Sequence, residues 1–381
     1  MTHALIIGGG VAGAATAMAL HKAGISATVY EAYPSGGEDI GAFLMIMPNG
    51  MNALRAIDAH GPVVAASFRT DHVEYLDAAG KVFTARQIHD SDPDGPRTLT
   101  RAALYHALQG ELLARGGRIE HGKRLTTATT TPYGRVLASF ADGTRAEGDL
   151  LIGADGMRSV TRTLIDPQAP APRYTGEAVV YGYTEVADIP QAHNTFRMIH
   201  GTRTSFGYTT STEGVTFWVA HVPGPERSRA ELAATPWRER ALELLRDDPD
   251  PAAARIVAAP GADPLGAGVF DIASLPRWYR GSMVLVGDAA HAAGPQAAQG
   301  ASMALEDSVV LAQCLRDLPG PAEAFTTFER IRRARVERLV AQSAERAATL
   351  DEAEQMSRPE QRSWLYEHRL DWDTPITSTV G

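Results

Sequence analysis

The sequence predicts an α/β fold that combines a parallel βαβ unit with an antiparallel sheet and C-terminal helices. The apolar run Ala4–Ile7 stops at glycines, as a short buried parallel strand does. Residues 174–222 alternate apolar and polar side chains and are rich in Tyr, Thr, Phe and Trp, which is typical of antiparallel strands. Residues 321–356 are charged and amphipathic, which predicts a long helical region that we expect to contain a break.

The individual elements follow in chain order. The alanine-rich residues 11–23 predict a helix that Gly24 ends, and Thr28–Glu31 predicts the second strand, completing a βαβ unit of about thirty residues. The remaining predicted elements are a helix at 98–115, strands at 145–153, Val179–Tyr183, Thr204–Thr210 and Val215–His221, a helix near 237–246, a strand at Ser282–Val286 and a helix from near Gly300.

A chain of 381 residues is long enough for about two intimately joined domains. We expect residues 1–173 and 267–320 to form one discontinuous nucleotide-binding domain. Residues 174–266 would form a substrate-binding β-sheet domain to which parts of 40–100 contribute, and residues 321–381 a C-terminal helical region.

Composition limits the possible partners. The chain is 44% apolar and 21% charged, with a formal net charge of −9, which disfavours non-specific binding to nucleic acid or to an anionic membrane. The single cysteine, Cys314, excludes an internal disulfide and is expected to be a small buried residue. No secretory signal and no membrane-spanning stretch is apparent, so we expect a cytoplasmic monomer or homodimer.

A glycine cluster carries the functional argument. Gly8-Gly9-Gly10-Val11-Ala12-Gly13 contains G-x-G-x-x-G between a predicted strand and a predicted helix, and Glu31 ends the next strand. Gly8 permits the tight turn, Gly10 lets the backbone approach a pyrophosphate, and Gly13 lets helix and strand pack closely. Because Glu31 would bind ribose hydroxyls and repel a 2′-phosphate, this Rossmann-type unit predicts FAD or NAD rather than NADP.

Later motifs favour FAD. Gly287-Asp288 follows the strand that ends at Val286, and a carboxylate after a strand suits a polyol chain such as the ribitol of FAD. Gly294-Pro295 and Gln299-Gly300-Ala301 would let backbone come close to a flat ligand and would present a helix N-terminus to it. Ala154-Asp155-Gly156 is a third glycine turn after a strand.

With these motifs, residues 3–340 resemble the FAD-dependent aromatic hydroxylases, the single-component flavoprotein monooxygenases typified by p-hydroxybenzoate hydroxylase. The motifs in the family's order are Gly8 to Glu31, Asp155-Gly156 with Arg158-Ser159, Trp278-x-x-Gly281 leading to Gly287-Asp288-Ala289-Ala290-His291, and Pro295…Gln299-Gly300 with Glu306-Asp307. Supporting matches are Gly41…Pro48-Asn49-Gly50…Leu54 and Arg101…Leu104…Leu108. The chain departs from the family at Ala298 (often Gly), Ser302 (often Asn), Ala32 (commonly Arg) and Val180-Tyr181-Gly182 (often Trp-Arg-Gly).

The resemblance implies which residues contact FAD. These are Gly8, Gly10, Val11, Ala12, Gly13, Glu31, Arg101, Leu125, Asp155, Asp288, Gly300 and Ala301. It also implies that Pro295, Gly300 and Ala301 line the flavin ring as the catalytic positions, and that His291 is structural.

The resemblance also implies the reaction. NAD(P)H would reduce FAD, O2 would add to the flavin C4a, and the hydroperoxide would deliver one oxygen to an aromatic ring, hydrophobic or polycyclic here. No metal is required, and the chain has no second G-x-G-x-x-G. Epoxidation, Baeyer–Villiger insertion, oxidative decarboxylation and dehydrogenation on the same scaffold remain alternatives, as does a non-enzymatic flavin-binding module.

The substrate side is predicted from two features. The sheet at 179–221 would form the substrate roof, with alternate strand residues facing the pocket. The flavin-side loop would supply Met45 and Met47. The expected substrate-lining residues are Met45, Met47, Tyr181, Tyr183, Arg197, Met198, His200, Phe206, Tyr208 and Trp218, with His200 or Tyr181 as a base toward a phenol.

Near the C-terminal end, Arg332, Arg333 and Arg335 with Glu329 predict a solvated charged face. Trp364 and Trp372 are expected to anchor the tail on the body of the protein or, as an alternative, on a partner subunit.

Overall fold

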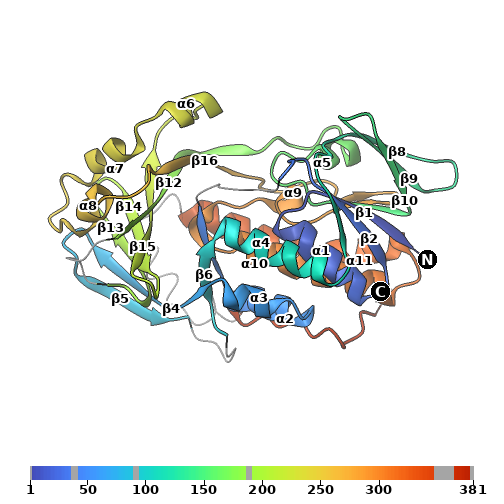
Figure 1. Ribbon diagram of the computed structural model, residues 1–381, viewed down its shortest axis with the longest axis horizontal. Coiled ribbons are helices and arrows are strands. Elements are labelled where there is room, and N and C mark those ends of the chain that lie inside the picture. The colour runs from blue at the N-terminus through green and yellow to red at the C-terminus, as the bar shows by residue number, and fades with distance from the viewer. Residues whose placement is uncertain (1, 36–41, 89–93, 186–190, 347–363, 378–381) are drawn as a thin grey trace.

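The computed structural model describes residues 2–35, 42–88, 94–185, 191–346 and 364–377. Within these ranges the chain forms two regions side by side, each built on a large sheet (Figure 1). The segment 347–356 of the expected C-terminal helical region, and Gly41, lie outside the described residues.

The first region contains a six-stranded sheet in the order β17-β18-β11-β1-β2-β7. Its strands pair in parallel except for β17, as the predicted βαβ unit requires. They are β1 (His3–Ile7), β2 (Ser26–Tyr30), β7 (Arg118–Glu120), β11 (Leu150–Gly153), β17 (Tyr279–Arg280) and β18 (Met283–Leu285).

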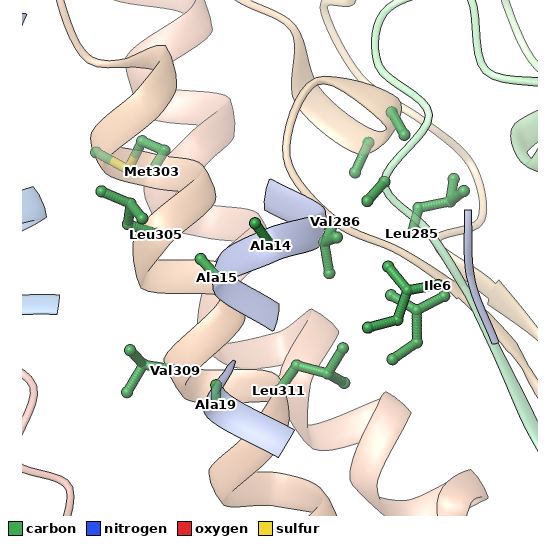
Figure 2. Packing of buried hydrophobic residues seen from close by; sticks show 14 of the residues in the cluster. Ile6, Ala14, Ala15, Ala19, Leu285, Val286, Met303, Leu305, Val309 and Leu311 are labelled. Carbon is green, nitrogen blue, oxygen red and sulfur yellow. The ribbon is translucent and has the colours of Figure 1, made fainter. Parts of the chain in front are cut away.

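Four helices pack around this sheet: α1 (Val11–Lys22), α4 (Arg101–Ala114), α10 (Gly300–Asp317) and α11 (Pro321–Arg346). Helix α1 is rich in alanine, so its backbone approaches α10 closely, and Figure 2 shows Ala15 and Ala19 beside the α10 residues Leu305 and Val309. The small side chains therefore bring the start of α1 and the start of α10 to the same end of the sheet.

Two predicted boundaries were wrong. The helix expected at 98–115 begins at Arg101, because residues 97–100 form a strand and the Thr100 hydroxyl caps the helix by accepting the Ala103 N–H at 3.1 Å. The strand expected at 145–153 is two strands separated by Asp149, since β10 pairs with β9 and β11 pairs with β1. The first belongs to a small sheet of β8 (Leu125–Thr130), β9 (Val136–Phe140) and β10 (Arg145–Gly148).

The second region is a nine-stranded, mainly antiparallel sheet in the order β16-β12-β15-β14-β13-β4-β6-β3, with β5 paired to β4. Strands before residue 101 and strands after residue 172 therefore share one sheet. Its strands are β3 (Phe43–Ile46), β4 (Phe68–Asp77), β5 (Val82–Gln87), β6 (Arg97–Thr100), β12 (Arg173–Glu185), β13 (Asn194–His200), β14 (Ser205–Thr210), β15 (Val215–Pro223) and β16 (Leu265–Asp271).

Short helices complete the fold. Helices α7 (Trp237–Leu245) and α8 (Ala252–Ala258) lie on the side of the nine-stranded sheet that faces away from α1 and α10, and α6 (Arg229–Ala234) lies near them (Figure 1). The other short elements are α2 (Pro48–Ala56), α3 (His60–Ala65), α5 (Val160–Ile165), α9 (Asp288–His291) and the 3-10 turn η1 (Pro295–Ala297).

The described part of the tail is anchored on the body, as predicted. The guanidinium of Arg316 lies 4.9 Å from the centre of the Trp372 ring and also donates to the Trp372 carbonyl at 2.7 Å. Cys314 is buried, as expected, and burial raises its thiol pKa to about 12, which suits a packing role. Within the described ranges, every helix is too short or too polar to cross a bilayer.

Candidate active site

The first glycine loop requires glycine at two positions. Gly8 has a φ of +101°, and a Cβ there would lie 2.4 Å from the Ala154 carbonyl oxygen. A Cβ on Gly13 would lie 1.8 Å from the Gly8 carbonyl oxygen. Gly10 differs, because a Cβ there would meet no protein atom within 4 Å, and no side chain caps the helix that starts at Val11. The N–H groups at the start of this helix, from Val11 to Gly13, are therefore presented to open space, as an anionic ligand requires.

Glu31 lies beside this loop at the end of β2. Its carboxylate is buried and accepts the Gly9 N–H at 2.6 Å and the Tyr33 N–H at 2.9 Å. Gln109 of α4 fixes the loop from the other side by donating to the Gly9 carbonyl at 2.8 Å. The sequence analysis missed Gln109. The signal was a glutamine on the same helix face as Leu104, Leu108 and Leu112, the face that the pattern of apolar residues predicts to be buried.

Leu125 starts β8 close to the same strand end. The Lys123 N–H donates to the Glu31 carbonyl at 2.8 Å, which brings this segment beside β2. The Leu125 side chain is buried in the hydrophobic core, so only its main chain is available to a nucleotide.

The two motif aspartates differ in what they can bind. Both carboxylate oxygens of Asp155 are used within its own turn, by the Ser159 hydroxyl at 2.6 Å and by the Thr161 N–H and hydroxyl at 2.9 and 3.0 Å. Asp155 thus shapes the turn against which Gly8 packs, and its expected contact with the cofactor stays a prediction. Asp288 is half-buried, and its carboxylate has no hydrogen-bond or ion-pair partner among the described residues.

Asp288 faces the start of α10, where a Cβ on Gly300 would lie 3.8 Å from its Oδ1. Pro295 is exposed, and Gly300 and Ala301 are partly exposed. No side chain caps α10. The turn before it holds Ala298 in the left-handed region at a φ of +50°, the position where the family often has glycine.

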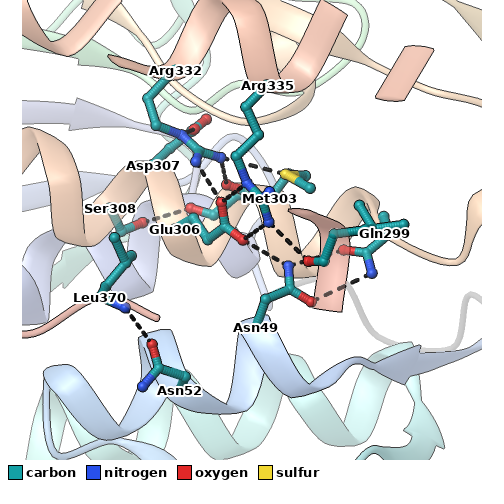
Figure 3. Close-up of polar contacts among 12 residues, drawn as sticks. Asn49, Asn52, Gln299, Met303, Glu306, Asp307, Ser308, Arg332, Arg335 and Leu370 are labelled. Carbon is teal, nitrogen blue, oxygen red and sulfur yellow. Dashed lines mark hydrogen bonds and ion pairs between the residues drawn. The ribbon is translucent and has the colours of Figure 1, made fainter. Parts of the chain in front are cut away.

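A buried network of charges lies against the start of α10, next to this turn (Figure 3). The Arg332 guanidinium is completely buried and pairs with Glu306 and, at 2.7 Å, with Asp307. Arg335 binds both oxygens of Glu306 at 2.8 Å. The solvated face predicted for this arginine run was therefore wrong for Arg332 and Arg335, because their partners lie on α10 rather than on α11 itself. Arg333, which pairs with Glu329, is only partly buried.

The network reaches the cofactor side through four contacts. Asp307 accepts the Gly287 N–H at 2.8 Å and pairs with His291 Nε2 at 2.6 Å, which supports the structural role implied for His291. Asn49 donates to Glu306 at 2.7 Å and to the Gln299 side chain at 3.0 Å. The turns on either side of α9 and the start of α10 are thus held by paired charges.

The nine-stranded sheet has two different faces. The face toward the first region carries Phe43, Tyr181, Tyr183 and Phe217, whose rings meet edge to face with centroids 4.8 to 6.5 Å apart. Met198 packs on this side against the main core. Met45 and Met47 are buried in that core beside the aromatic cluster.

Four of the expected substrate-lining residues lie on the opposite face. Phe206, Tyr208 and Trp218 are buried in a separate core with α7 and α8, and Arg197 pairs there with Glu74 at 2.8 Å and with the Tyr208 hydroxyl at 3.3 Å. Their assignment to the flavin-facing side was wrong. The register puts Tyr208 and Trp218 on one face of the sheet, and that face packs against α7 and α8. Arg197 and Tyr208 instead line an outer pocket of about 290 Å³.

The two expected bases are poor proton acceptors for different reasons. Burial raises the pKa of Tyr181 to about 12, although the nearby charge of Arg101 at the start of α4 opposes this, so Tyr181 keeps its proton at neutral pH. Burial, and the charge of His221, lower the pKa of His200, whose ring stacks on Tyr75 at 5.9 Å and whose Nε2 is buried without a partner in the described structure.

Comparison with known proteins places this geometry in a family. Residues 1–343 match the family model described as FAD binding domain. The chain belongs to this family. It is 30% identical to an aurachin C monooxygenase/isomerase of Stigmatella aurantiaca over 88% of this chain and 85% of the relative. It is 32% identical to a 3-amino-4-hydroxybenzoate 2-monooxygenase of Streptomyces platensis, over 90% and 86% respectively.

Solved structures of flavin-binding proteins have the same fold as this chain. The Klebsiella pneumoniae protein HpxO, crystallised with FAD and uric acid, superposes with a TM-score of 0.80 and 25% identity over 97% of this chain and 93% of that one. The resemblance to the FAD-dependent aromatic hydroxylases is confirmed, and the chain is a flavin-dependent monooxygenase of this type.

The residues present fit FAD. The uncapped start of α1 with open space at Gly10 would hold the pyrophosphate, Glu31 the adenosine ribose, and the unpartnered Asp288 carboxylate a hydroxyl of the ribitol. When bound, FAD supplies the redox chemistry that activates dioxygen. The start of α10 would present its N–H groups to the flavin ring.

Proposed function

We propose that this enzyme uses NAD(P)H and O2 to hydroxylate a hydrophobic aromatic small molecule with fused rings. The observation that carries the proposal is the aromatic cluster of Phe43, Tyr181, Tyr183 and Phe217 on the sheet face turned toward the flavin side. An apolar, aromatic wall favours a flat, weakly charged ring system.

The charge distribution supports the same substrate class. Arg197, the basic residue expected on the substrate side, lies on the other face of the sheet and is paired with Glu74. A small carboxylated ring would need a cation on the flavin-facing side. The cation whose charge reaches Tyr181 there is Arg101, which we expect to contact FAD rather than the substrate. Among the relatives, a protein of Rhodococcus erythropolis is named as a probable 2-heptyl-3-hydroxy-4(1H)-quinolone synthase, and a quinolone is a fused-ring compound.

The chain's own residues would do three things in the reaction. The glycine loops and Asp288 hold the cofactor, the aromatic cluster orients the substrate ring, and the sheet closes the site against water. No second G-x-G-x-x-G is present in the sequence, so NAD(P)H would have to bind at the same cofactor region rather than in a domain of its own.

The test is NADH and NADPH oxidation by the FAD-loaded protein with a panel of quinolones, indoles, naphthols and simple phenols under ¹⁸O2. We expect a fused-ring compound to stimulate oxidation and to gain one ¹⁸O atom. Stimulation without oxygen gain would indicate a dehydrogenase. A product in which the gained oxygen lies within a ring would indicate Baeyer–Villiger insertion, and no reduction by either nucleotide would refute the proposed reductant.

A further inference from the structure

A histidine–carboxylate pair lies on the flavin-facing side of the sheet, apart from the two histidines discussed above. His221 Nδ1 on β15 lies 3.2 and 3.3 Å from the two carboxylate oxygens of Glu177 on β12. The register places His221 directly opposite Val179, and the Val179 side chain packs in the same hydrophobic cluster as Phe43 and Tyr181. The pair therefore faces the same space as the proposed substrate wall.

Gln296 joins this pair to the flavin-side turn. Its side-chain N–H donates to Glu177 Oε1, and Gln296 directly follows Pro295. The Ser343 hydroxyl of α11 donates to the Gly294 carbonyl at 3.0 Å, which fixes the start of the same turn. The pair is thus held at the boundary between the sheet and the residues expected to line the flavin ring.

The contacts determine which nitrogen of His221 is available. The Nδ1–H of His221 donates a hydrogen bond to the Glu177 carboxylate, so the lone pair of the imidazole is on Nε2. Nε2 has no hydrogen-bond partner among the described residues and is not fully enclosed, since the side chain is about 15% exposed. His291 shows the opposite case, because Asp307 occupies its Nε2 in a fully buried site.

We propose that His221 is the proton acceptor for the substrate and that Glu177 is its positioning residue. This inference rests on the proposed hydroxylation. The substrate is thereby narrowed to aromatic compounds with an ionisable ring hydroxyl or ring N–H. In the step, the proton moves from that oxygen or nitrogen to His221 Nε2, and the electron pair of the broken bond stays on the heteroatom.

The consequence is an electron-rich ring. The electron pair left on the heteroatom delocalises onto the ortho and para carbons of the ring, which are the positions that then accept oxygen. No oxidant is consumed in this step, and the Glu177 carboxylate stabilises the imidazolium that forms. The titratable groups that interact with His221 include Glu177 from β12 and His200 from β13, and Tyr181 also lies within electrostatic range of Glu177. Gln296 from η1 is uncharged.

The first experiment measures ionisation rather than turnover. The probes are 4-nitrophenol and 4-nitro-1-naphthol, whose anions are coloured, titrated with pH in the presence of the FAD-loaded protein. We expect wild type to lower the apparent pKa of the bound probe so that the ionisation constant rises about tenfold or more, and His221→Gln to abolish this shift. Glu177→Gln should retain only a part of it, and the double variant should be no worse than His221→Gln.

His72→Gln is the matched control. His72 also pairs with a carboxylate, Asp71, at 2.6 Å, but it lies on β4 next to Val73 and is half-exposed. Its loss should leave probe ionisation unchanged. If wild type binds neither probe, or binds them with unchanged ionisation, or if His72→Gln has the same effect as His221→Gln, the assignment is overturned.

The second experiment uses a substrate found with the panel. His221→Gln should lower kcat for oxygen transfer by about 10²–10⁴-fold with little change in KM, and the loss should shrink as the pH rises and the substrate ionises in solution. A uniform loss at all pH values would indicate a structural role and overturn the assignment. If wild type ionises the probes but transfers no oxygen, the hydroxylation proposal fails and the His221 assignment stands.

Discussion

The flavin side and the sheet side of this site are built from different interactions. On the flavin side, the turns are fixed by glycines that nothing larger could replace and by fully buried charges, Arg332 with Glu306 and Asp307. On the sheet side, the wall is made of aromatic rings in mutual contact, and the His221–Glu177 contact beside it is partly exposed. Buried charges depend on each partner, whereas apolar contacts tolerate change of identity. Substitutions should therefore separate the two sides by size of effect and by which property changes.

The largest effect is expected from Arg332→Met, which leaves two carboxylates buried without their cation. We expect the free energy of unfolding to fall by about 3–5 kcal/mol. Arg333→Met is the matched control, since Arg333 neighbours Arg332 in the chain but is partly exposed, and its loss should cost about 1 kcal/mol or less. Urea denaturation of both variants measures the difference, and equal losses would show that the buried network adds nothing.

A second effect of similar origin should appear in acid. Burial alone would raise the pKa of Glu306, but the charges of Arg332 and Arg335 lower it to about 2, and those of His291 and Arg332 bring Asp307 to about 2 as well. Because both folded-state values lie below the unfolded ones, the stabilisation is complete above about pH 4.5 and is lost as the pH falls toward 2.

Wild type should thus lose a few kcal/mol across this window. Denaturant titrations between pH 5 and pH 2 measure the slope, and Arg332→Met should flatten it. A slope that is unchanged in the variant would place the acid-sensitive groups elsewhere.

The contrast also explains what could be predicted from the sequence. The tight turn at Gly8 and the close packing at Gly13 were predicted correctly because each of these backbone arrangements demands glycine at one spacing. The ribose contact of Glu31 and the ribitol contact of Asp288 stay predictions. Arg332 was misjudged because helix periodicity describes only a helix's own face, and its partners lie 25 and 26 residues earlier on α10.

The orientation of side chains in the nine-stranded sheet was harder to predict from the sequence, for a different reason. Alternation divides a strand into two faces but does not say which one meets the flavin, so Tyr181 was assigned correctly to the flavin-facing side and Trp218 was not. The His221–Glu177 pair was missed for the same reason, since only the register of β12 with β15 brings these residues together. A model of strand pairing, rather than composition, would have found it.

Trp218→Leu tests the two faces of the sheet. Trp218 is completely buried against α7 and α8 and stacks on Phe206 at 5.7 Å. We expect a loss of about 1–3 kcal/mol in unfolding free energy with FAD affinity unchanged. FAD fluorescence quenching and urea denaturation measure the two quantities, and a weakened FAD affinity at unchanged stability would mean that this face contributes to the site after all.

Gly10→Ala should show the reverse pattern. A Cβ at this position has open space around it in the protein, and the backbone dihedrals, φ −70° and ψ −164°, are open to alanine. The apoprotein should therefore change by less than about 1 kcal/mol. FAD affinity should fall about tenfold or more, because the methyl group would stand where the pyrophosphate approaches. Unchanged affinity would show that the cofactor does not approach this loop.

The smallest effect is expected at Ala298, where the flavin-side turn departs from the family's glycine. An alanine at a φ of +50° costs about 1–2 kcal/mol of backbone strain. Ala298→Gly relieves this strain but increases the entropy of the unfolded chain by about 0.4–1 kcal/mol, so the two effects nearly cancel. We expect a net stabilisation below about 1 kcal/mol, measured by urea denaturation. A clear destabilisation would mean that packing of the Ala298 methyl group against the core outweighs the backbone strain. The Ala298 turn would then be stabilised by apolar contact, as the sheet side is, and not by a requirement for glycine.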